Sequence, residues 1–73
     1  MNRYKIRSIL DFIRNQGRLP TDERGVILDQ DDILAWFGLD NLLNPAEQRQ
    51  VKQELLAMIE AQAFMERVHL EQR

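Results

Sequence analysis

The segment from Pro45 to the end of the chain constrains the fold most, because the 28 residues after this proline include neither glycine nor proline. These two residues disfavour a helix interior most strongly, so we expect one long helix here. Asn44 can cap its start, Pro45 suits the first helical position, and Glu47 stands where a capping box places an acid. From Pro45 to Val68 such a helix would be about 36 Å long. A compact domain of 73 residues is about 29 Å across, so the helix is expected to overhang, bend or end early.

Two apolar stripes run along this predicted helix. The first comprises Val51, Leu55, Met58 and Ile59, and the second, displaced around the helix, comprises Ala61, Phe64, Met65 and Val68. The other predicted helices are short, so the second stripe is expected to lack cover and to belong to a partner surface. The alternative is that the helix predicted over residues 3–15 packs along this end, with the tail after about residue 69 frayed.

The two shorter helices are predicted from apolar spacing and end signals. The helix over residues 3–15 has the i, i+3, i+4, i+7 pattern, at Ile6, Ile9, Leu10 and Ile13. Residues 30–37 predict a second helix, capped by Asp29 and stopped at Gly38 by a Schellman motif. We therefore expect a mainly α, compact three-helix domain that comprises residues 1–73 as a single unit.

Residues 18–28, between the first two predicted helices, form the least regular stretch. A small β-hairpin could pair residues 18–21 with residues 26–28 across a turn. Alternatively, the stretch is an extended loop whose apolar residues plug the core. Two strands alone are not stable, so a hairpin would have to lie on the helices. Both interpretations remain open from the sequence.

No residue pattern supports catalysis, a cofactor or a metal site. The chain has no cysteine, and its single serine, Ser8, is far in sequence from its single histidine, His69. A catalytic triad is therefore not predicted. Asp29, Asp31 and Asp32 resemble the start of a calcium-binding loop, but the later positions that need an oxygen ligand and a glycine are apolar. We expect a non-enzymatic protein without cofactor or metal.

The chain is also not expected to enter a membrane. Its longest uncharged, apolar-rich run is the seven residues from Ile33 to Leu39, whereas a membrane helix needs about 20. Charges at Arg3, Lys5 and Arg7 are too frequent for a secretory signal. We therefore expect a soluble, cytoplasmic protein.

Charge is unevenly distributed along the chain. Residues 1–18 hold five basic residues and one acidic residue, whereas residues 19–48 hold seven acidic residues and one basic residue. On a helical wheel Arg3, Arg7 and Arg14 fall within about 40° of one another and form a basic stripe. Charge polarity of this kind steers encounter with a partner and sets its orientation.

These features favour binding of another protein, through which the chain would modulate a larger protein machine. Trp36 and Phe37 cannot both point the same way from a short helix, so one is expected to be an exposed interface anchor. The predicted partner-binding residues are Arg3, Arg7, Arg14, Trp36, Phe64, Met65 and Val68. The short, cysteine-free, charged and non-enzymatic character of residues 1–73 resembles the small phage-encoded regulators that bind host RNA polymerase or other host machinery. The resemblance implies transcription regulation, such as inhibition, by binding polymerase without an active site in this chain.

The alternative interpretation is a DNA-binding protein of helix-turn-helix type, formed by residues 30–53. Its second helix would offer Gln48, Arg49 and Lys52 to nucleic acid. Against this, the aspartates around residues 29–40 would approach the phosphates, whereas a DNA-binding face is normally basic. A homodimer through the long helix is compatible with either interpretation.

Overall fold

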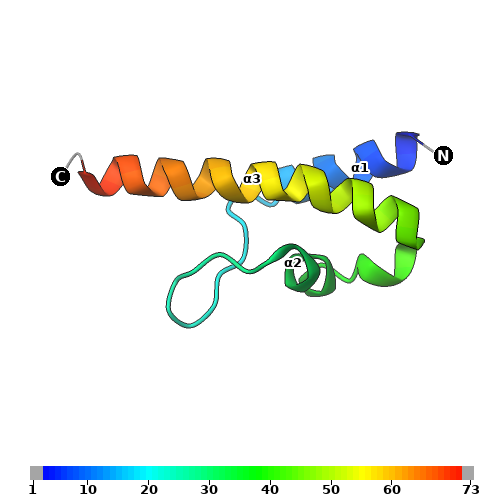
Figure 1. The fold of residues 1–73 in the computed structure, drawn as a ribbon, viewed down its shortest axis with the longest axis horizontal. Helices are drawn as coiled ribbons and strands as arrows, with labels where there is room; N and C mark the ends of the chain where they lie inside the picture. The colour runs from blue at the N-terminus through cyan, green and yellow to red at the C-terminus, as the bar shows by residue number, and fades with distance from the viewer. Residues whose placement is uncertain (1–2, 72–73) are drawn as a thin grey trace.

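The computed structural model describes residues 3–71, and the side chains of residues 3–69. Within them the fold is mainly helical, as predicted, and its elements are α1 (Arg3–Asn15), α2 (Gln30–Trp36), the short 3-10 helix η1 (Asp40–Leu42) and α3 (Pro45–Glu71). Helix α1 lies alongside the N-terminal half of α3, and α2 packs against the same half of α3 (Figure 1). The loop that joins α1 to α2 swings out beneath the middle of α3 (Figure 1).

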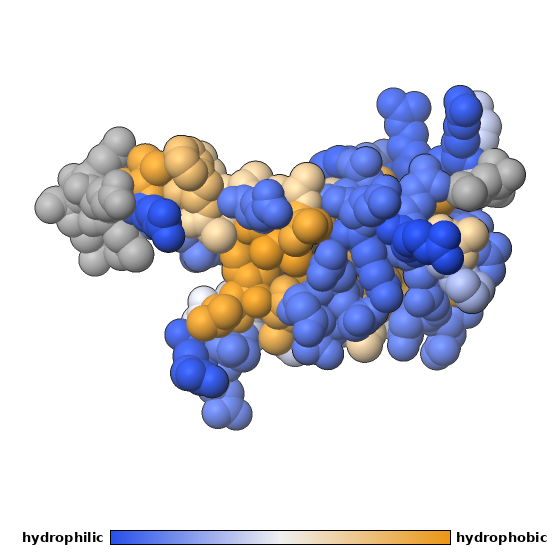
Figure 2. Space-filling model, viewed as in Figure 1, coloured by the Kyte–Doolittle hydropathy of each residue, from blue (hydrophilic) through white to orange (hydrophobic). Residues whose placement is uncertain are grey.

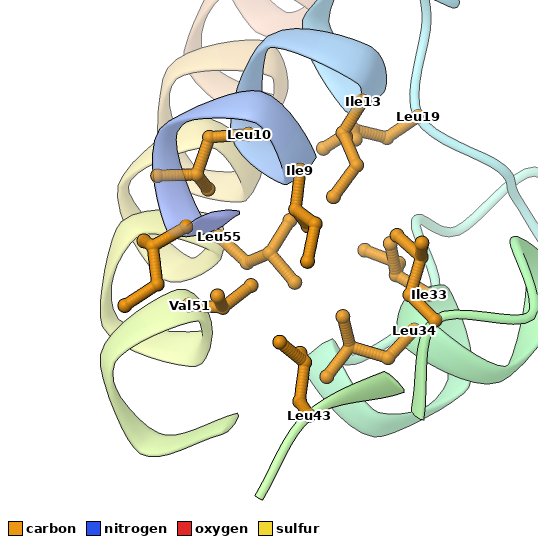
Figure 3. Close-up of a cluster of buried hydrophobic side chains, with 11 residues drawn as sticks. Ile9, Leu10, Ile13, Leu19, Ile33, Leu34, Leu43, Val51 and Leu55 are labelled. Carbon is orange, nitrogen blue, oxygen red and sulfur yellow. The ribbon is translucent and has the colours of Figure 1, made fainter. Parts of the chain in front are cut away.

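The core forms where the apolar faces of the three helices meet. All four residues that predicted the amphipathic pattern of α1 are buried, namely Ile6, Ile9, Leu10 and Ile13. Figure 3 shows the side chains of α1 meeting Val51 and Leu55 of α3 and Ile33 and Leu34 of α2. Each of these four partners is at most 1% exposed. The first stripe predicted on α3 therefore faces the core, and Met58 and Ile59 continue it as half-buried residues.

Of the two open interpretations of residues 18–28, the structure supports the extended loop and not the β-hairpin. The described residues contain no strand, and the stretch has only one isolated antiparallel bridge, between Thr21 and Ile27. Two backbone bonds flank the bridge, from Asp22 N–H to Val26 O at 2.8 Å and from Leu28 N–H to Pro20 O at 3.0 Å. At the turn, the Asp22 carboxylate accepts from the backbone N–H groups of Arg24 at 2.8 Å and Val26 at 3.0 Å. Such side-chain bonds compete with strand pairing. The loop is instead held by the buried Leu19 and by half-buried apolar residues at its far end, Ile27 and Leu28.

Helix α2 begins and stops by the predicted local signals. Asp29 Oδ1 accepts from the backbone N–H of Asp32 at 2.9 Å. At the other end, Gly38 takes a positive φ of 69° and its N–H donates to Ala35 O at 3.0 Å. The N–H of Leu39 donates to Leu34 O at 2.8 Å, which completes the Schellman motif. The helix ends at Trp36, one residue before the predicted end.

Helix α3 overhangs the rest of the domain, the first of the three outcomes expected for so long a helix. It is a continuous helix of 27 residues, about 40 Å long, and it reaches Glu71 rather than ending at Val68. The described chain measures 45 × 22 × 18 Å, with a radius of gyration of 13.1 Å, against about 11 Å for a compact domain of this length. Figure 1 shows the C-terminal half of α3 projecting past both α1 and α2.

Candidate protein-binding surface

The loop over residues 18–28 and the projecting half of α3 enclose two open grooves. The first, the Met65 groove, has a volume of about 660 Å³ and is lined by Arg18, Leu19, Pro20, Thr21, Gly25, Gln62, Met65, Glu66 and His69. The second, the Val26 groove, has a volume of about 530 Å³ and is lined by Gly25, Val26, Ile27, Ile59, Ala63, Glu66 and Arg67. Figure 2 shows a hydrophobic area where this loop meets α3. Because Glu66 and Gly25 line both grooves, the two form one continuous region of surface.

A small polar network holds the start of the loop against α3. The backbone N–H of Leu19 donates to Gln62 Oε1 at 2.8 Å, and Gln62 Nε2 donates to Glu66 Oε1 at 3.2 Å. The same carboxylate oxygen accepts from Arg18 Nη2 at 3.0 Å. Residues 62 and 66 are one helical turn apart, so both reach the loop from one face of α3. The network ties the start of the loop to α3 beside the Met65 groove.

The tail residues predicted to bind a partner are exposed but lie on two different faces of α3. Phe64 and Met65 are each 64% exposed, and Val68 is half-buried. Met65 lines the Met65 groove, whereas Phe64 and Val68 line neither groove. Consecutive helical residues are about 100° apart around the axis, which separates Phe64 from Met65. The second apolar stripe is therefore split between a groove and an outer helix face.

The basic stripe of α1 is fully on the surface, as predicted. Arg3, Arg7 and Arg14 are all exposed, and Arg14 contacts Asp11 at 3.4 Å on its own helix. None of the three lines either groove. The structure therefore presents the stripe as a separate charged surface on α1.

The adjacent aromatic residues divide as expected. Trp36 is 65% exposed, whereas Phe37 is half-buried. The ring of Phe37 meets that of Phe12 edge to face, with centroids 5.7 Å apart and an interplanar angle of 86°. Trp36 lines neither groove, so the structure does not bring it together with Met65.

Sequence analysis did not identify most residues of the grooves. Gln62, Glu66, Leu19, Pro20 and Val26 were not predicted to form a site, because the groove residues of the loop and those of α3 are more than thirty residues apart along the chain. The sequence gives a partial indication, because Val26–Leu28 is an apolar run inside an otherwise polar stretch and is expected to contact other apolar residues. Which segment such a run contacts depends on tertiary packing, which no local pattern specifies.

The residues proposed to address DNA are largely engaged within the domain. Gln48 Nε2 donates to the backbone oxygens of Asp40 at 3.0 Å and Leu43 at 3.2 Å, and thereby ties η1 to α3. Lys52 forms an ion pair with Asp31 of α2. Arg49 is exposed and, with the other two, lines a shallow hollow of about 400 Å³. A carboxylate paired with Lys52 would repel a phosphate, so this face is poorly suited to nucleic acid.

Among the described side chains, Glu47 has the one clearly shifted pKa, and its role is structural. Its Oε1 accepts from the backbone N–H of Asn44 at 3.0 Å and from Lys5 Nζ at 3.1 Å. These bonds, the one from the Asn44 backbone first, hold the pKa of Glu47 below its ordinary value of 4.5. The group lies at the start of α3, so it joins α1 to α3 and belongs to neither groove.

The described part of the chain offers neither a metal-binding cluster nor a membrane span. Among residues 3–71, no group of three or more His, Cys, Asp or Glu side chains could hold a metal ion. None of the helices in this range is long and apolar enough to span a membrane. The grooves beside residues 18–28 are therefore the strongest candidate site in the described structure.

No protein-family model, curated protein or solved structure matches this chain. What it binds must therefore be inferred from the chemistry of its own surface. That surface combines two apolar grooves, a basic stripe on α1 and an uncovered outer face on α3.

Proposed function

We propose that this chain is a binding protein that modulates a larger protein machine by contact through the Met65 and Val26 grooves. The observation that carries the proposal is the exposure of large apolar side chains around a pre-formed pair of grooves. Met65 is 64% exposed and Val26 is 60% exposed, and both lie where α3 leaves the body of the domain. Contiguous apolar surface with a polar rim is characteristic of protein interaction sites.

The grooves suit a short apolar segment of the partner. Their surface is mainly apolar, and their charged lining residues are Arg18, which pairs with Glu66, and Arg67. A partner side chain that enters either groove would lose water from an apolar surface, which supplies binding energy. Because Gln62 and Glu66 already fix the loop, little ordering would be needed on binding.

The basic stripe on α1 supports a partner with an acidic surface. Arg3 and Arg7 are exposed and lie on the same side of one helix, so they add to a local positive potential. Exposed charges of this kind mainly raise the rate and specificity of encounter. The stripe would attract an acidic surface, and the grooves would then take up its apolar side chains.

The most concrete candidate partner is RNA polymerase. The support for it is the resemblance of the chain to small phage-encoded regulators, which act in the cytoplasm by binding host machinery. In this proposal the chain has no catalytic role, and it regulates or inhibits transcription by occupying a surface of the polymerase. Protein binding is favoured over DNA binding because Gln48 and Lys52 are engaged within the domain.

A direct binding measurement with matched variants tests the proposal. Met65→Glu should weaken binding to purified RNA polymerase by about tenfold or more, because it places a charge in the groove. Leu42→Glu is the matched control, since Leu42 is 56% exposed but lines neither groove. If the partner is a protein other than RNA polymerase, capture from host lysate followed by mass spectrometry should identify it. Met65→Glu should weaken the binding of that partner as well.

Two outcomes would contradict the proposal. One is equal loss of partner binding in Met65→Glu and Leu42→Glu, which would mean that the groove has no special role. The other is salt-dependent binding of short duplex DNA by the purified chain with no protein partner recovered. That result would favour the helix-turn-helix interpretation instead.

A further inference from the structure

The outer face of α3, on the side away from the core, carries a regular apolar pattern. Ala57, Ala61, Phe64 and Val68 follow one another at spacings of four, three and four residues, the spacing of a coiled-coil seam. At about 100° per residue, this seam lies about 130° around the helix from the buried face of Val51 and Leu55. The two alanines and Phe64 are exposed, and Val68 is half-buried. We call these four residues the outer seam.

Two copies of the outer seam have complementary side-chain sizes in only one relative orientation. Its N-terminal half is small, with Ala57 and Ala61, and its C-terminal half is large, with Phe64 and Val68. If two copies pair antiparallel, the large half of each seam meets the small half of the other. Each Phe64 then fits opposite an alanine. A parallel pairing would instead crowd Phe64 against Phe64 and leave gaps between the alanines.

The charges beside the seam favour the same orientation. Glu60 and Arg67 flank the seam on one side, about 20° apart around the helix, and both are exposed. Neither forms an ion pair with another residue within the described range 3–71. An antiparallel pairing brings Glu60 of each copy beside Arg67 of the other, and symmetry makes this pair occur twice. A parallel pairing places neither residue beside an opposite charge.

We propose that the outer seam is a self-association surface, on which a second copy of this chain packs antiparallel along α3. The two-fold axis passes near residues 62 and 63, between the small and large halves. The seam lies across α3 from Glu66, one of the two residues shared by the grooves, so the dimer leaves the Met65 groove of each copy open. Arg67, at the edge of the Val26 groove, pairs with the second copy. Phe64 and Val68 then contact the second copy, and Met65 remains in its groove. This proposal does not depend on the identity of the partner protein.

Helices α1 and α2 of each copy lie away from the seam. Helices α1 and α2 pack on the N-terminal half of α3 (Figure 1), on its buried face, whereas the seam occupies the opposite side of the projecting half. The seam is short, because Glu54 stands at the position that would continue it toward the N-terminus. From residue 57 to residue 68 it extends about 17 Å along the helix. We therefore expect a reversible, concentration-dependent dimer.

Sedimentation velocity over a series of protein concentrations tests for the dimer. The full-length chain should shift from monomer to dimer as its concentration rises. Phe64→Glu should weaken dimerisation by about 100-fold, because both copies lose their largest seam residue and gain a charge. Trp36→Glu is the matched control, since Trp36 is 65% exposed, against 64% for Phe64, but lies on α2. Circular dichroism should show both variants folded, because both side chains are exposed.

Charge exchange tests the antiparallel orientation. Glu60→Arg and Arg67→Glu should each weaken the dimer by about tenfold, because each places like charges together twice. The double variant E60R/R67E restores opposite charges and should recover the dimer to within about twofold of the original. Two results would overturn the proposal. Either the native chain stays monomeric at all concentrations, or the variants F64E and W36E dimerise equally well. A double variant as weak as either single variant would overturn the antiparallel orientation.

Discussion

Glu47 joins three parts of the fold through one carboxylate oxygen. The residue is 6% exposed, and its Oε1 accepts from the N–H of Asn44 and from Lys5 Nζ of α1. Its own N–H donates in return to Asn44 Oδ1 at 2.8 Å, which completes a capping box. The sequence predicted the capping box, because it depends only on neighbouring residues. The ion pair with Lys5 spans 42 residues, so it could not be predicted.

The lowered pKa of Glu47 makes a specific contribution to the pH dependence of stability. Because the folded pKa lies below the ordinary value of 4.5, folding favours the charged carboxylate. The contribution is therefore fully present above about pH 4.5 and is lost as the pH falls through the folded pKa. We expect the free energy of unfolding of the native chain to exceed that of Glu47→Gln at about pH 7, and the difference to shrink toward zero as the pH falls below the lowered pKa of Glu47.

Urea denaturation of both proteins at several pH values measures this difference. The comparison with Glu47→Gln removes the contribution of the other carboxyl groups, which titrate in both proteins. Lys5→Met is a second probe, and it should reduce the difference by removing the partner on α1. A difference that is constant over the whole pH range would show that Glu47 stabilises the fold without its charge.

At the scale of elements, helix ends were predicted well and contacts between elements were not. Asp29 and Gly38 define the two ends of α2 because capping and the Schellman motif act over a few residues. By contrast, the loop at residues 18–28 forms one bridge rather than a hairpin, and its start is tied to α3 by the bond from Leu19 N–H to Gln62 Oε1. The overhang of α3 depends on how much helix α1 and α2 can cover. The spacing of residues along the sequence predicts neither the conformation of the loop nor the overhang of α3.

The stop of α2 allows a clear prediction at this scale. Gly38 has a φ of +69°, and a Cβ added there would meet nothing within 4 Å. Gly38→Ala should therefore lower the free energy of unfolding by about 1 to 2 kcal/mol through backbone conformation alone. Thermal or urea denaturation measures the loss. Gly38→Asn is the control and should cost less, since asparagine tolerates the left-handed region better. Equal stability of all three proteins would mean that the chain can end α2 without this conformation.

The molecule as a whole separates its charged surface from its apolar surface. The basic residues of the stripe lie on α1, the acidic Asp31 and Asp32 lie exposed on α2, and the uncovered apolar residues lie on the projecting half of α3. Sequence analysis predicted each of these surfaces from its own segment. It could not predict that Met65 would join a groove with residues 18–21 while Phe64, its neighbour, faces away. That division depends on where the loop packs, which is a property of the whole fold.

This separation predicts that charge location, rather than net charge, controls the rate of partner binding. Arg3→Glu/Arg7→Glu should slow association by about tenfold at low salt, because it reverses the stripe that steers an acidic partner. Arg14 is left unchanged, since it contacts Asp11. The matched control is Arg24→Glu/Arg49→Glu, which changes the net charge equally at two exposed arginines outside the stripe.

Stopped-flow or surface-plasmon measurements with the captured partner, at several salt concentrations, distinguish the two double variants. The stripe variant should lose most of the salt dependence of the association rate, because steering by exposed charges is screened over about 8 Å at physiological ionic strength. The control should keep that dependence, and both should unfold at the temperature of the native chain, since all four arginines are exposed. If the two variants bind equally slowly, net charge alone sets the rate and the stripe is ordinary solvated surface. If only the stripe variant is slow while its dissociation rate is unchanged, the arginines act in encounter and the apolar grooves hold the complex together.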